Sequence, residues 1–323
     1  MKKVLAAAGL FFCMTVSAHA AGDVKISGAV ELQYMISSDK YETQGDDAIK
    51  FEELYIQIEA EVAENISGMI KLDAADMNEV GGGNKDHDSS MVEEAQIIFR
   101  NIAGQPLTVY VGKDEMPWIQ DYEKFLFSSE VHGKEVDKVI GVHGQYKIDG
   151  FGSVDLAFFE RDSDNKPADK YETGLTDSMT VKLTADKLVD NLSLSLGYKK
   201  EGKDKAALST ETDDATGTSI AAIYKVAGLT IHAEMLSMED HDGASEEDIK
   251  QVGLDYKLGN FLLKGRYETV DADDGAGDDD TLTAYGVSYY FDKKAYMVIE
   301  HETDDPDAGD SVDTTMVGFN LKY

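Results

Sequence analysis

The sequence has little cysteine, proline or tryptophan: one Cys, four Pro and one Trp among 323 residues. The single cysteine, Cys13, lies within residues 1–20, a predicted export signal. We therefore expect the exported chain to lack disulfides, thiolate metal sites and a cysteine nucleophile. Few prolines and no Ser/Pro-rich linker leave no mark of a domain boundary, which predicts one continuous domain over residues 21–323.

Long apolar runs are also missing, because no later stretch approaches the roughly 20 apolar residues that a transmembrane helix needs. Residues 1–20 do carry Lys2 and Lys3, a short apolar run from Val4, and the small-x-small triplet Ala18-His19-Ala20. This is the pattern of a cleaved signal peptide, so we expect export and a mature chain that begins at Ala21.

Basic residues are scarce, with 30 Lys and Arg against 63 Asp and Glu and a formal net charge of −33. Phosphate backbones repel so acidic a chain, which excludes nucleic acid as a partner. The Asp-rich stretch 271–280 lacks the bidentate Glu of an EF-hand loop. We predict no dedicated metal site and no cofactor.

What the sequence does contain is alternation of apolar and polar residues, the period of a strand with one apolar face. Leu54, Ile56, Ile58, Ala60 and Val62 alternate with Glu53, Tyr55, Gln57, Glu59 and Glu61. About sixteen such segments begin near residues 24, 51, 66, 91, 107, 138, 153, 177, 192, 218, 229, 250, 261, 281, 295 and 314. An all-β chain is predicted.

The connections alternate between tight turns, such as Val226-Ala227-Gly228, and long loops. The last segment alternates up to an aromatic residue, Tyr323, as in strands that the barrel-assembly machinery reads. These features predict a transmembrane antiparallel up-and-down β-barrel in the outer membrane, with short periplasmic turns and long acidic external loops. A secreted sandwich or propeller also has short alternating strands, but long strands and alternating loop lengths count against it.

Most of the negative charge falls in the predicted external loops. The extreme case is the loop that holds Asp273, Asp274, Asp278, Asp279 and Asp280. A mouth of one sign attracts ions of the other, so we predict cation attraction that high salt weakens. The alternative is that these loops are simply solvated, or are bridged by divalent cations to the surrounding lipopolysaccharide and lipid.

The inward face of the predicted strands mixes both signs, as expected for a wall that holds water. The candidate pore-lining residues are Glu59, Glu94, Arg100, Arg161, Lys264 and Arg266. A barrel of this size is too wide for side chains to fill, so a lumen is expected. Loop 114–136 is unusually apolar and is predicted to narrow it, through Lys113, Asp114, Glu115, Trp118, Asp121 and Tyr122. The alternative is a loop packed on the rim or on a neighbouring subunit.

From about Phe51 to Glu160, five stretches are similar to the LbtU-like siderophore porins. They are Ile56–Val62, Val92-Glu93-Glu94-Ala95, Val109–Lys113, Pro117-Trp118 and Gly152-Ser153-Val154. The family's Pro-Phe-Gly turn is replaced by Pro117-Trp118-Ile119. The resemblance covers about a third of the chain, and it implies passage of a ferric chelate or another small solute across the outer membrane.

We therefore expect a channel for passive or facilitated diffusion of small hydrophilic solutes rather than an enzyme. The first alternative is a structural, adhesive or partner-binding barrel. A hydrolase is less favoured, because no Gly-x-Ser-x-Gly elbow accompanies the inward candidates His143, His232, His301, Ser193 and Ser195. A homotrimer and a monomer are both compatible with the sequence.

Overall fold

The computed structural model describes residues 23–37, 49–73, 92–120, 129–160, 177–203, 214–239, 246–272, 280–306 and 310–322. The predicted signal peptide 1–20, with Cys13, and the terminal Tyr323 lie outside these residues. So does most of the chain in the predicted external loops. Within the described chain, no helix is long and apolar enough to cross a membrane.

Sixteen strands make up the described chain, together with two short 3-10 helices, η3 (Ile102–Gly104) and η4 (His132–Lys134). The strands are β1 (Val24–Ser37), β2 (Ile49–Ala63), β3 (Ile66–Asp73), β4 (Val92–Phe99), β5 (Leu107–Met116), β6 (Val136–Ile148), β7 (Gly152–Phe159), β8 (Ser178–Val189), β9 (Leu192–Glu201), β10 (Ala215–Val226), β11 (Leu229–Glu239), β12 (Glu246–Leu258), β13 (Phe261–Ala272), β14 (Asp280–Tyr290), β15 (Ala295–Pro306) and β16 (Val312–Lys322).

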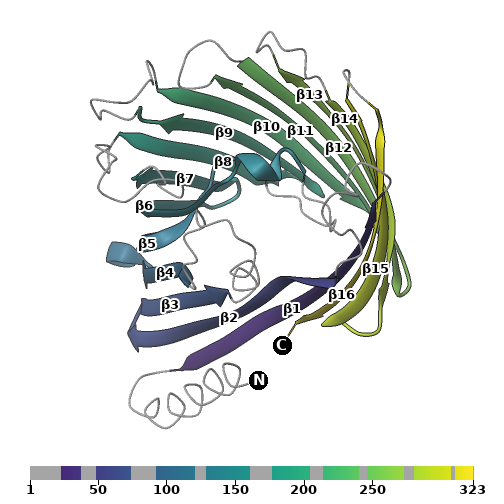
Figure 1. Ribbon diagram of the computed structural model, residues 1–323. Coiled ribbons are helices and arrows are strands. Elements are labelled where there is room, and N and C mark those ends of the chain that lie inside the picture. The colour runs from purple at the N-terminus through teal and green to yellow at the C-terminus, as the bar shows by residue number, and fades with distance from the viewer. Residues whose placement is uncertain are drawn as a thin grey trace, which may run out of the picture.

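The sheet closes on itself, so the predicted sixteen-stranded barrel is confirmed (Figure 1). Each strand pairs antiparallel with its neighbour in sequence, and β1 pairs with β16 through Tyr34 and Val317 to close the ring. Most strands begin within three residues of the predicted position. The largest difference is at β12, which begins at Glu246 rather than 250, because Glu247 and Asp248 continue the pairing with β13 despite their charge.

One rim is built from tight turns, as the sequence predicts. The connections β2–β3, β8–β9, β10–β11 and β12–β13 each leave two residues between paired strands. Such turns require positive φ, which Asn, Gly and a few other residues supply. Asn65 and Asn191 lie at φ 64° and 65°, and Ala227 and Gly228 at 45° and 85°. These turns bring consecutive strands into register without a long linker.

The two faces of the wall differ in chemistry, as β13 illustrates. Phe261, Leu263 and Tyr267 are 46%, 44% and 51% exposed and point outward. Lys264, Arg266 and Glu268, which alternate with them, are buried on the inner side. The same period of two on the other strands gives an apolar outer band and a polar inner wall, the arrangement that lipid on one side and water on the other require.

Candidate functional site

A segment between β5 and β6 lies inside the barrel. Residues 117–120 and 129–135 contact side chains from the inner face of β8, β10, β11, β12 and β13. Figure 1 shows the chain after β5 crossing the interior toward these strands. We call residues 117–120 and 129–135 the docked segment. All of its wall partners belong to the inward rows, so the docked segment occupies the lumen side of the sheet.

Trp118 is the anchor of the docked segment, with a side chain that is 1% exposed. Its carbonyl oxygen accepts a hydrogen bond from Ser219 Oγ at 2.8 Å, and its Nε1 donates to the Lys134 carbonyl at 3.0 Å. The Lys199 ammonium lies 4.9 Å from its ring centroid, within the range of a cation–π contact. Trp118 is therefore held by its backbone, its indole nitrogen and its ring face.

Two glycines make room for Trp118. A Cβ on Gly197 would lie 1.6 Å from the Trp118 carbonyl oxygen, and a Cβ on Gly217 would lie 3.0 Å from the indole ring. The first approach is closer than any side chain allows. Gly197 on β9 and Gly217 on β10 therefore form a socket in the inner wall that only glycine can supply at position 197.

Two buried carboxylates, on β11 and β13, also hold the docked segment. Glu234 on β11 accepts the backbone N–H of Gln120 at 2.9 Å, and Glu268 on β13 accepts the N–H of Glu130 at 2.7 Å. Glu234 and Glu268 are 1% and 0% exposed. Hydrogen bonds to a charged acceptor are roughly twice as strong as neutral ones. The segment is thus pinned at two points, one on each side of residues 121–128.

Charged side chains add two further contacts. The Lys134 ammonium pairs with Glu247 of β12 at 2.7 Å, and the Lys182 ammonium of β8 donates to the carbonyl of Ile119. Burial raises the pKa of Glu130, and the nearby carboxylates Glu268 and Glu247 act in the same direction, against Lys134. The docked segment therefore places an acid with a raised pKa beside the acidic inner wall.

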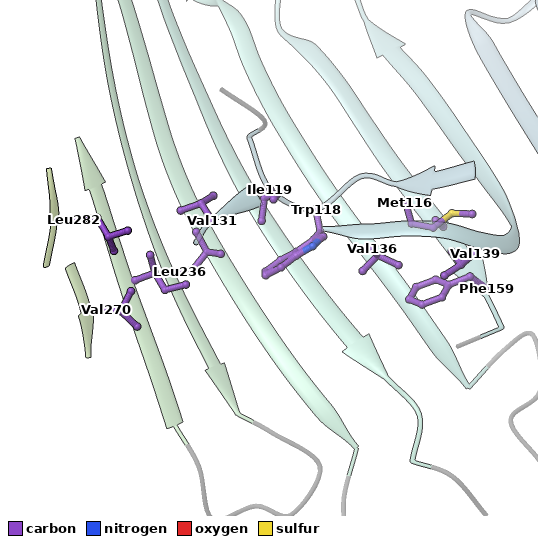
Figure 2. Close-up of a cluster of buried hydrophobic side chains, with 12 residues drawn as sticks. Met116, Trp118, Ile119, Val131, Val136, Val139, Phe159, Leu236, Val270 and Leu282 are labelled. Atoms are coloured by element: carbon purple, nitrogen blue, oxygen red, sulfur yellow. The ribbon is translucent and has the colours of Figure 1, made fainter. Parts of the chain in front are cut away.

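An apolar cluster fills the space between the docked segment and the wall (Figure 2). Its members are Met116, Trp118, Ile119, Val131, Val136, Val139, Ala157, Phe159, Leu236, Ile249, Val270 and Leu282. Full burial of one large apolar side chain contributes about 1.5–3 kcal/mol. This cluster inside a largely polar lumen is what keeps the segment against the wall rather than in the water.

The rest of the inner wall carries ion pairs. Lys264 pairs with Glu300, and Arg266 pairs with Glu302 at 2.8 Å. On the opposite side, Arg100 contacts both Glu59 at 2.6 Å and Ser67 at 2.6 Å.

Glu94 is the remaining described residue that was predicted to line the pore. Its Oε1 lies 3.5 Å from Nζ of Lys71, and the same Nζ lies 3.0 Å from Oε2 of Glu93. Of the predicted lining residues, Glu59, Glu94, Arg100, Lys264 and Arg266 therefore lie on the inner wall, and Arg161 lies outside the described residues.

The histidines divide between the two faces. His143 stacks on Tyr110 at 4.9 Å and contacts Asp155 at 3.0 Å on the inner wall, and His232 contacts Glu234 at 3.3 Å. His301 was expected to face inward, and this is wrong. It lies on the outer row of β15 against Tyr285, which is 57% exposed, since the inward position of that strand is held by Glu300.

The predicted constriction residues are only partly brought together. Trp118 is the centre of the docked segment, and Asp114 pairs in register with Val139 of the apolar cluster. Lys113 is on the outer row instead, opposite the exposed Ile140, and its ammonium donates to the Val92 carbonyl at 3.1 Å. That assignment is corrected because alternation along β5 turns position 113 away from the lumen. Glu115 is exposed.

Several predicted residues lie outside the described part of the chain. They are Asp121 and Tyr122 of the loop and Asp273, Asp274, Asp278 and Asp279 of the acidic mouth. Asp280 is described as the first residue of β14, in register with Val270 and Pro306. No group of three or more His, Cys, Asp or Glu side chains suited to a metal ion occurs among the described residues.

The wall residues that hold the docked segment were not predicted from the sequence. Gly197, Gly217, Ser219, Glu234 and Glu268 lie on four strands far from Trp118 in the chain. Each looks like an ordinary inward residue of an amphipathic strand. The one available signal was the run Gly197, Gly217 and Ser219 of small residues at inward positions on adjacent strands, which marks space for something in the lumen.

Comparison with protein families matches residues 4–323 to the family described as Gram-negative porin. Comparison with curated proteins returns no match. Among solved structures, in-vitro folded OmpT of Vibrio cholerae in its trimer form is 19% identical, with a TM-score of 0.68, covering 94% of this chain and 100% of that one.

Two other solved structures are similar in fold. The outer membrane channel DcaP of Acinetobacter baumannii is 17% identical, with a TM-score of 0.69, covering 94% of this chain and 98% of that one. Salmonella typhi OmpF in complex with daunomycin is 13% identical, with a TM-score of 0.67, over 94% and 98% of the two chains. At these identities the likeness concerns the fold.

Proposed function

Because this chain belongs to the Gram-negative porin family, an outer-membrane β-barrel family, we propose that it is a channel narrowed by the docked segment. Small hydrophilic solutes would cross by diffusion through the remaining lumen. The observation that carries the proposal is the attachment of the docked segment to the inner wall at Ser219, Glu234 and Glu268. A segment fixed there reduces the cross-section without closing the ring of strands.

We further propose that the channel prefers cations. On the inner wall, the basic residues Lys264, Arg266 and Arg100 are each paired with a carboxylate. By contrast, Glu268 accepts from Gln251 and a backbone N–H, and Glu31 accepts from Gln33 and Asn320. These neutral donors do not cancel charge, so Glu268 and Glu31 would each leave negative charge on the inner wall that attracts cations.

Planar-bilayer recording with a KCl gradient tests both parts. The refolded protein should give discrete conductance steps and a reversal potential of the sign for cation preference, which shrinks at high salt. Absence of steps would refute a channel, whereas steps with anion preference would refute only the selectivity. Trp118→Ala should enlarge the conductance, because it removes the anchor of the docked segment.

We also propose a class of solute for the channel. The resemblance of residues 51–160 to siderophore porins supports a ferric chelate as one cargo, beside general small solutes. Growth of a siderophore-dependent strain with and without this protein, at limiting iron, separates the two. A growth defect that a general porin does not repair supports the ferric chelate.

We propose a homotrimer as the assembly, since the similar OmpT structure is described as a trimer form. Light scattering of the detergent-solubilised protein measures the assembly directly. The alternatives are a structural, adhesive or partner-binding barrel and, less favoured, a hydrolase. A protein that inserts but conducts no ions would favour the first of these, and hydrolysis of ester substrates would favour the second.

A further inference from the structure

His132 stands at a distinct place in the docked segment. It is the first residue of η4, and its backbone N–H donates to Ser129 Oγ at 3.0 Å, which fixes the start of that turn. Its side chain is 34% exposed, whereas those of the inner-wall histidines His143 and His232 are 11% and 0% exposed. Among the described histidines on the lumen side of the sheet, His132 is therefore the most exposed.

The imidazole of His132 has a carboxylate partner. Its Nδ1 lies 3.1 Å from Oε2 of Glu135, whose side chain is 10% exposed. Both residues belong to the same short turn, so their separation is set by local backbone geometry. A neighbouring carboxylate favours the protonated imidazole, and the ring as a whole remains partly exposed.

The charged groups of this part of the docked segment, and of the wall residues that contact it, come from three elements. The docked segment contributes Glu130, Lys134 and Glu135, β12 contributes Glu247 and β13 contributes Glu268. Lys134, paired with Glu247 and also acting on Glu130, supplies one positive charge against the four acids of this group. With His132 neutral this part of the lumen is negative, and a proton on His132 removes one unit of that charge.

We propose that His132, with Glu135, is a specificity-determining element that sets how strongly the channel prefers cations, according to the protonation of the imidazole. The inference rests on the channel function proposed above and names one residue that tunes it. An imidazole usually changes its charge near pH 6.5. The channel then prefers cations more at pH 7.5 than at pH 5.5.

The size of the effect follows from electrostatics in a wet pore. One unit charge about 6 Å from a passing ion, screened by about 0.1 M salt, changes the ratio of cation to anion permeability about two- to fourfold. The permeability ratio of the wild-type channel should fall by about that factor between pH 7.5 and 5.5. Variants that differ only at position 132 isolate the contribution of the imidazole to this change.

The experiment measures reversal potentials of the wild-type protein, His132→Gln and His132→Lys in planar bilayers at pH 7.5 and 5.5. Gln keeps a hydrogen-bonding side chain without the charge. The His132→Gln channel should therefore lose the imidazole's part of the pH response and keep the high cation-to-anion permeability ratio at both pH values. Lys is charged at both pH values, so the His132→Lys channel should have the low cation-to-anion permeability ratio already at pH 7.5. His301→Gln, on the outer wall, is the matched control and should respond as the wild type does.

The fluorescence of Trp118, the sole tryptophan, confirms that each variant keeps the segment docked. A conducting channel in which His132→Gln responds to pH as fully as the wild type, and His132→Lys keeps the wild-type ratio at pH 7.5, would overturn the assignment. The proposed channel function would survive that result. It would fail only if the wild-type protein itself gave no conductance steps.

Discussion

The carbonyl oxygen of Trp118 lies 1.6 Å from the position that a Cβ on Gly197 would occupy. The docked segment and β9 therefore approach so closely that one added methyl group at position 197 would prevent docking. This relationship makes the docking of the segment testable by substitutions that leave the rest of the barrel unchanged.

We predict that Gly197→Ala displaces the docked segment. Overpacking of a tight contact costs about 1–3 kcal/mol, and here the obstacle is backbone rather than a flexible side chain. Trp118 emission should shift to the red as its ring meets water, and single-channel conductance should rise. Gly265→Ala, where a Cβ meets nothing within 4 Å, is the matched control. Unchanged Trp118 emission in Gly197→Ala would contradict the socket.

The two carboxylate contacts predict a graded response. Glu234→Ala or Glu268→Ala removes the acceptor of the Gln120 or the Glu130 N–H, and a buried donor left without a partner costs about 1–3 kcal/mol. Glu→Gln at the same positions keeps an acceptor and should have a smaller effect.

The measurement is quenching of Trp118 by acrylamide, together with the noise of the open-channel current. Ala variants should be quenched more than Gln variants at both positions. Equal quenching of the two types at either position would show that the hydrogen bond from the segment does not hold it there.

The sequence predicted the barrel well because each strand encodes its own pattern. The start of β1, β3, β5, β9, β11, β13 and β15 could be read from local alternation and turns alone. Trp118 could be singled out in the same way, as an aromatic residue in a long connection. The wall residues Gly197, Glu234 and Glu268 could not, because the curvature of the barrel brings three separate strands to the docked segment.

The errors have a similar origin. His301 and Lys113 were assigned to the lumen from their polarity, but a period of two gives the face only when the phase of the strand is known. The exposed neighbours Tyr285 and Ile140 set that phase in the folded barrel. Polar residues near a strand end can face outward, where the apolar band has ended.

The buried pair Lys264–Glu300 should matter more than an exposed pair. Its side chains are 3% and 0% exposed, so removing one partner deprives a buried charge of its ion-pair partner, which costs about 3–5 kcal/mol. Glu300→Gln should therefore lower the temperature at which the barrel loses its compact gel mobility. Asp214→Asn breaks the pair with Lys200, which is 37% exposed, and should change this temperature little.

A double variant separates charge from packing. Lys264→Met with Glu300→Gln removes both charges, so it should recover part of the stability that Glu300→Gln loses. A double variant as unstable as the sum of the two single variants would indicate that the pair is not energetically coupled.

The docked segment should hold more tightly in acid. The pKa of Glu130 is raised above its usual value, chiefly by burial, so the protonated carboxyl is favoured when the segment is docked. For a raised pKa the stabilising contribution is fully present below the undocked pKa and is lost as pH rises through the docked pKa. Acrylamide quenching of Trp118 should therefore increase as the pH rises from about 4 through that range.

Glu130→Gln tests the cause of this pH dependence. The amide is neutral at every pH and keeps the backbone N–H that Glu268 accepts, so docking should stay as tight at pH 7 as at pH 4. Glu115→Gln, at an exposed position of β5, is the control and should preserve the wild-type pH profile. If Glu130→Gln retains that profile too, other carboxylates control docking, and the burial of Glu130 carries no consequence for it.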